Sequence, residues 1–106
     1  MVHEAAAEKA RSRADRESVA SYHQAALTKL LEHVRTGFAR YDEGQIDAFE
    51  LDELIHRYKR ATTELWKFCG ATGSQVAAAA RAIDWRTREG QAIDWWEEGG
   101  LRRPRT

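Results

Sequence analysis

The sequence predicts an all-α fold, and three observations support this class. Alanine, glutamate, arginine and leucine dominate, and these residues favour helices. The one proline, Pro104, lies near the C-terminus, so no proline interrupts a helix before it. Apolar residues recur at three- or four-residue spacing, and no long stretch alternates with the period of two typical of a strand. We therefore expect a long antiparallel helical hairpin, a third helix and a short C-terminal helical segment.

The composition narrows the class of protein. A chain of 106 residues can bury one core without disulfides. Its 17 basic and 17 acidic residues cancel, so nucleic-acid binding is not favoured. Cys69 is the only cysteine, which indicates a reducing compartment, and no stretch resembles a signal peptide or a membrane span. These features predict a cytoplasmic protein without membrane contact.

Three segments are expected along the chain. Residues 1–17 form an arm of alanines and charges, which is either a helical extension or disordered. Residues 18–98 form a single helical domain. Residues 99–106 begin with two glycines and carry three arginines, and we expect a flexible basic tail.

The first two helices are expected from Ser18 to Tyr41 and from Asp47 to Cys69. Gly44, just after the first helix, suits the left-handed conformation that commonly ends a helix. Asp47 and Glu50 have the spacing of a capping box at the start of the second helix. Each helix carries one apolar stripe, made up of Val19, His23, Leu27, Leu30, Leu31, Val34, Phe38 and Tyr41 in the first, and of Leu51, Leu54, Ile55, Tyr58, Thr62, Leu65 and Cys69 in the second.

Folding the second helix back on the first around Gly44 brings the two stripes together. Phe38 then meets Leu51, and Val34 meets Leu54. Because apolar residues meet at nearly every level, the pattern favours an antiparallel hairpin. Two helices leave one side uncovered, so we expect two copies to complete a four-helix bundle as a homodimer.

The third helix is expected to begin after Ser74 as its N-cap and to stop near Gly90. Residues 92–98 suit one or two further helical turns. The tetrapeptide Ala-Ile-Asp-Trp at 82–85 recurs at 92–95, and two copies indicate a coincidence or a local similarity in packing more than a repeat architecture.

The segment from Asp42 to Glu53 contains six carboxylates and no basic residue. Its second half resembles an EF-hand calcium loop, but Ala39 and Tyr41 stand where calcium needs oxygen ligands. A helix corner with a capping box explains most of the segment. It does not explain Asp42 and Glu43, which lie at the negative end of a helix dipole and are candidates for binding a basic protein partner.

Glu53 and His56 have a Glu-x-x-His spacing, similar to the half-motif of ferritin-like di-iron proteins. Glu32 lies at the level of His56 in the predicted hairpin. The resemblance implies a site for a divalent metal such as iron, manganese or zinc. All three residues lie away from the apolar stripes, so such a site requires a dimer; otherwise Asp52–His56 and Glu53–Arg57 are ordinary surface pairs.

Four tryptophans are many for this length. Trp66 flanks the stripe of its helix and is expected in the core. Trp85, Trp95 and Trp96 either cover the hairpin or contact a protein partner, because tryptophan is common in interface hot spots.

Three further interpretations concern single features. Cys69 is expected as a small buried residue, and His23 as a core histidine. The basic turn of Arg57, Lys59 and Arg60 is expected to be solvated.

No complete catalytic set is present in the sequence. We therefore expect a small non-catalytic helical interaction module, an adaptor or regulatory protein that needs no cofactor. Its acidic corner or its tryptophan-rich C-terminus would contact the partner. A metal-binding bundle built from Glu32, Glu53 and His56 across a dimer is the alternative.

Overall fold

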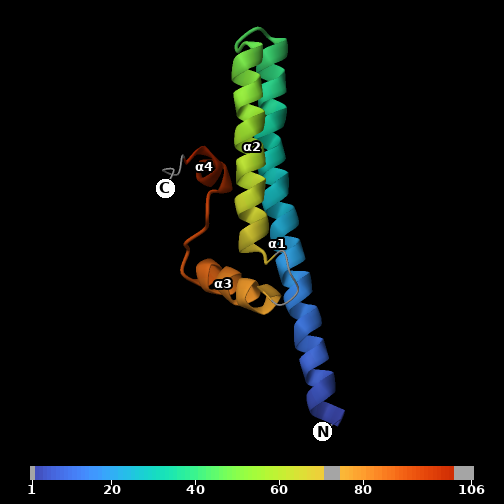
Figure 1. Cartoon of the computed structure of the whole chain (residues 1–106). Coiled ribbons are helices and arrows are strands. Elements are labelled where there is room, and N and C mark those ends of the chain that lie inside the picture. Colours follow the sequence, from blue (N-terminus) through green and yellow to red (C-terminus); the bar gives the residue numbers. More distant parts are fainter. Residues whose placement is uncertain (1, 71–74, 102–106) are drawn as a thin grey trace, which may run out of the picture. The chain divides into compact units, whose positions relative to one another are not determined.

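The computed structural model describes residues 2–70 and 75–101, and within these ranges the chain is helical and contains no strand. Figure 1 shows four helices, α1 (Val2–Asp42), α2 (Ala48–Phe68), α3 (Val76–Arg88) and α4 (Trp95–Gly100). The predicted all-α class is confirmed for this part of the chain.

The described chain divides into two compact units. Of the described residues, unit 1 contains 2–24, 66–70 and 75–92, and unit 2 contains 25–65 and 93–101. The single domain expected over residues 18–98 stays a prediction. None of the four helices is both long enough and apolar enough to cross a bilayer.

α1 begins at Val2, well before Ser18, so the charged arm is the first part of this helix. The side chains of residues 3–14 are exposed to solvent. Burial therefore does not explain this helical structure. Its alanines and its charged side chains have high intrinsic helix propensity, which is sufficient to extend a helix that already exists.

The start of α2 has the predicted capping box. The backbone N–H of Glu50 donates to Oδ1 of Asp47 at 2.8 Å, and the backbone N–H of Asp47 donates to Oε1 of Glu50 at 3.2 Å. Gly44 has a φ of 75°, as the left-handed end of α1 requires. Ile46 and Leu51, on either side of the cap, are both buried.

In unit 2, the C-terminal part of α1 packs on α2 through Gly37 (Figure 1). A methyl group at Gly37 would lie 2.7 Å from Cδ1 of Leu54, so a larger residue there would require the Leu54 side chain to move. Gly37 faces Leu54 and Leu51 of α2, and the neighbouring Phe38 is 47% exposed, so whether Phe38 meets Leu51 stays a prediction. The core of unit 2 consists of Ala26, Leu30, Ile46, Leu51, Ala61, Leu65 and Trp95.

Unit 1 contains the N-terminal part of α1, the end of α2 and α3. The ring centroids of Tyr22 and Phe68 are 5.8 Å apart. Gln75 precedes α3 without a side-chain cap, and the expected cap, Ser74, lies outside the described residues. α3 ends at Arg88, followed by Gly90 with a φ of 65°, close to the predicted end. The core of unit 1 consists of Val19, Cys69, Ala79, Ala80 and Ile83.

Candidate functional site

α4 is a short helix that begins at an aspartate. The backbone N–H of Glu97 donates to Oδ1 of Asp94 at 3.2 Å, which caps the helix. The equivalent residue in the other copy of the repeated tetrapeptide, Asp84, lies inside α3 and pairs with Arg88 at 2.9 Å. The aspartates of the two copies therefore have different structural roles, which does not indicate a repeat architecture.

Trp96 of α4 is held between two side chains of unit 2. The imidazole of His33 stacks on the indole with ring centroids 4.4 Å apart and planes only 2° from parallel. The guanidinium carbon of Arg57 lies 4.6 Å from the indole centroid, within the range of a cation–π interaction. α1 and α2 each supply one of these side chains, so the position of Trp96 depends on both helices.

Two arginines of α2 bind the backbone of α4. Nε of Arg57 donates to the carbonyl of Trp96 at 2.9 Å, and Nε of Arg60 donates to the carbonyl of Gly99 at 2.8 Å. Arg57 also pairs with Glu97 at 3.2 Å. The carbonyl of Gly99 lies in the last turn of α4, where carbonyl groups lack partners within the helix, and Arg60 supplies one. The prediction of a solvated face is wrong for Arg57, whose side chain is half-buried against α4, whereas Lys59 and Arg60 are exposed as predicted.

Gly99 brings α4 into direct contact with the backbone of α2. A methyl group at Gly99 would lie 2.6 Å from the carbonyl oxygen of Arg57 and 2.7 Å from Cβ of Ala61. Gly99 and Gly100 were expected in a flexible tail, but both belong to α4 and Gly99 is buried. Residues 102–106 of that expected tail lie outside the described residues. We call His33, Arg57, Arg60 and Ala61 the α4 docking site.

The two C-terminal tryptophans are therefore parts of unit 2. Trp95 is buried and Trp96 is half-buried. In this structure Trp95 is not available to contact a partner, and Trp96 is already held by His33 and Arg57. The sequence allowed for tryptophans that cover the helix pair instead of contacting a partner, because two packed helices leave one side uncovered.

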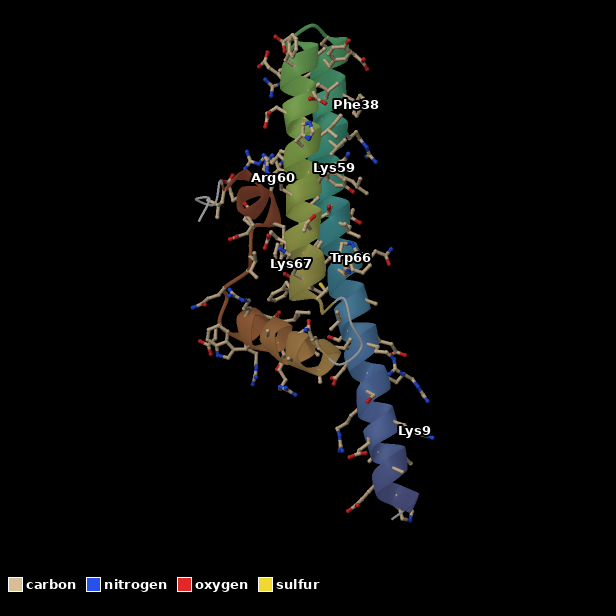
Figure 2. The ribbon with its side chains drawn as sticks, in the orientation of Figure 1. Lys9, Phe38, Lys59, Arg60, Trp66 and Lys67 are labelled. Carbon is tan, nitrogen blue, oxygen red and sulfur yellow. The ribbon has the colours of Figure 1, made fainter. Side chains whose placement is uncertain are left out.

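The opposite flank of unit 2 is less covered. At 100° per residue, Leu31 and Phe38 lie within about 20° of each other on α1 and about 140–160° from His33, which faces α4. Leu31 is 49% exposed and Phe38 is 47% exposed. In Figure 2, Phe38 lies on the side of unit 2 away from α4, whereas Arg60 lies beside α4.

On α2, the same geometry places Ile55 about 160° from Arg57 and therefore on the side of Phe38. The side chain of Ile55 is half-buried. We call Leu31, Phe38 and Ile55 the open flank.

The acidic corner is exposed. Asp42 and Glu43 are both on the surface, and Oε2 of Glu43 accepts a hydrogen bond from Nε2 of Gln45 at 3.1 Å. Phe49, in the first turn of α2, is 86% exposed. Whether Asp42 and Glu43 bind a basic partner stays a prediction.

The proposed metal ligands have other neighbours in the monomer. Nε2 of His56 lies 3.2 Å from Asp52, the surface pair that the sequence predicted. Glu53 lies 3.8 Å from Arg60, whereas Arg57, its expected partner, pairs with Glu97. Glu32 is exposed on α1. Within residues 2–70 and 75–101 of one chain, no three His, Cys, Asp or Glu side chains form a group that could hold a metal.

Two further tryptophans have clear positions within unit 1. Trp66 was expected in the core but is 53% exposed, and its ring contacts the ring of His23. The centroids of these two rings are 4.4 Å apart in an edge-to-face contact. Trp85 is 49% exposed, so it remains a candidate for contact with a partner.

Two polarisable side chains of unit 1 are shielded from solvent: His23 is half-buried and Cys69 is buried. Nε2 of His23 is buried without a hydrogen-bond partner, and burial lowers the pKa of its imidazole. Cys69 is buried as predicted, and burial raises the pKa of its thiol to about 11. A thiol with so high a pKa is a poor nucleophile at neutral pH.

A scan against protein-family models and searches of the curated proteins and of the solved structures found no match to this chain. The functional interpretation therefore depends on the site geometry alone.

Proposed function

We propose that this protein is a small, non-catalytic helical interaction module that acts as a homodimer through its open flank. The observation that carries the proposal is the exposure of Leu31 and Phe38, two large apolar side chains on the flank opposite α4. α4 covers one side of an antiparallel hairpin formed by residues 25–42 and 48–65. A second copy would cover the other side and complete a four-helix bundle.

The size of the flank is compatible with a dimer. Eighteen residues of helix span about 27 Å. Two neighbouring helices are about 20 Å across, so each copy offers roughly 500 Å². Two copies would bury roughly 1,000 Å² in total, which is about the minimum for a specific interface. We therefore expect a dimer that dissociates on dilution.

The charges at the edges of the open flank favour a second copy in antiparallel orientation. Asp42 on α1 and Asp52 on α2 lie near the corner, and Arg35 and Lys59 lie seven residues further from it. Seven residues correspond to about 10 Å along a helix. When two flanks meet in opposite directions, the acidic ends of the two copies lie at opposite ends of the interface, about 27 Å apart. Parallel packing would place like charges together.

The mass of the protein in solution tests this proposal. Phe38→Glu places a carboxylate in the interface and is expected to weaken dimerisation about 30-fold or more, measured by light scattering across a dilution series. Phe49→Glu is the matched control, because Phe49 is also exposed but lies at the acidic corner, and it should leave the dimer intact. Equal masses for the two variants and the unmodified chain at every concentration would refute the proposed interface.

A further inference from the structure

We propose that the α4 docking site is a peptide-recognition site, and that α4 is its built-in, exchangeable occupant. Its ligand class is a short helical turn of another protein with an aspartate cap, a tryptophan, a following glutamate and a glycine pair. α4 would then compete with such a partner for the same surface of unit 2. This site is distinct from the open flank, which lies on the opposite side.

The contacts of α4 define the ligand. The indole of Trp96 stacks on His33 at 4.4 Å and faces Arg57 at 4.6 Å. Arg57 also favours a ligand with an acidic side chain after the tryptophan, because it pairs with Glu97 at 3.2 Å. A tryptophan without the following carboxylate would lose one of these contacts.

The backbone contacts add a requirement for a small residue. Arg60 donates to the carbonyl of Gly99 at 2.8 Å, and any side chain at Gly99 would collide with the backbone of Arg57. The collision involves backbone atoms of a helix, which cannot move aside as a flexible side chain can. The site therefore selects both the aromatic residue and the glycine three positions after it.

The same features make α4 exchangeable. A helix of six residues is too short to be stable in isolation, so its structure depends on docking. Residues 89–92, which precede its cap, are exposed and lie outside any helix, so the segment can detach without unwinding α3. Its anchors are side chains of α1 and α2, helices that extend far beyond the site. Release of α4 would withdraw the buried side chain of Trp95 from unit 2 but leave His33, Arg57, Arg60 and Ala61 in place on α1 and α2.

The test uses the full chain with its own occupant weakened. Gly99→Leu prevents α4 from docking while leaving the residues of the docking site unchanged. Leucine has a higher helix propensity than glycine, so any weakening of α4 docking comes from the collision with α2. The probe is a fluorophore-labelled peptide of residues 93–101 with the natural sequence. Its fluorescence anisotropy is measured against the unmodified chain and against the variant.

We expect the Gly99→Leu chain to bind the peptide at least about tenfold more tightly than the unmodified chain does, because a tethered competitor acts at a high effective concentration. Adding Arg57→Met to this variant should abolish the gain. A peptide with Trp96→Ala should bind about tenfold more weakly or worse.

Equal binding by the unmodified and Gly99→Leu chains, or equal binding of the two peptides, would overturn the proposal. Circular dichroism checks that the variant keeps its helices. If it does not, the full chain with Trp96→Ala takes its place. Loss of helical structure in both variants would also overturn the proposal, because α4 would then be an inseparable part of the core.

Discussion

Replacing Arg57 with methionine should release α4 while leaving the rest of unit 2 folded. Arg57 makes three contacts with α4: a hydrogen bond to the carbonyl of Trp96, an ion pair with Glu97 and a cation–π contact with the indole of Trp96. Methionine keeps most of the aliphatic stem but has no donor and no charge, so Arg57→Met removes all three contacts with little change in packing.

The three contacts are unequal in free energy. A hydrogen bond from a charged donor contributes about 1.5–3 kcal/mol. The cation–π contact contributes about 0.5–1 kcal/mol at a partly exposed site. Because Glu97 is 71% exposed, its ion pair contributes less than about 1 kcal/mol. We expect a total loss of about 2–4 kcal/mol for the docking of α4, since neighbouring contacts are not strictly additive.

Amide hydrogen exchange of Glu97 and Glu98 measures this loss directly, because local opening of α4 exposes these N–H groups. Lys59→Met is the matched control, since it removes the same charge from an exposed position of α2. Protection of α4 that is unchanged in Arg57→Met, or lowered equally in Lys59→Met, would show that Arg57 does not hold α4.

Three further predictions concern the rest of the molecule. Asp47→Ala removes the cap of α2 and should lower the free energy of unfolding by about 1 kcal/mol in urea titrations; Asp42→Ala, at the negative end of α1, should not lower it. The thiol of Cys69, with a pKa of about 11, should resist an aromatic disulfide reagent at pH 8 until the protein unfolds. Between about pH 9 and 11 the folded thiol keeps its proton and the unfolded thiol loses it, so the free energy of unfolding should fall as the pH rises through this range. Cys69→Ala should remove this pH dependence. Burial lowers the pKa of His23, so the unfolded state binds more protons than the folded state near pH 6. The free energy of unfolding should therefore fall as the pH drops through the unfolded pKa of 6.5. The same pH dependence in His23→Gln would exclude His23 as its source.

Local features of the fold could be predicted from the sequence. The capping box of Asp47 and Glu50, and the left-handed Gly44 that precedes it, follow from short-range rules that depend on a few neighbouring residues. The burial of Cys69 follows from its place on an apolar stripe.

The α4 docking site could not be predicted in the same way. Arg57 and Arg60 have the composition of a solvated turn, and only their contacts with residues about 40 positions later give them their role. The side of α1 that faces Leu54 includes Gly37, which belongs to no apolar stripe, while the neighbouring Phe38 is 47% exposed. One signal was available: a glycine pair after two tryptophans marks a place where a backbone can approach another closely.

The light-scattering mass of the unmodified chain, followed from high to low concentration, is the most direct test of the proposed homodimer. The chain has a mass of 12.1 kDa. We predict twice this value at high concentration and a fall toward 12.1 kDa on dilution. A mass of 12.1 kDa at every concentration would contradict the proposed function.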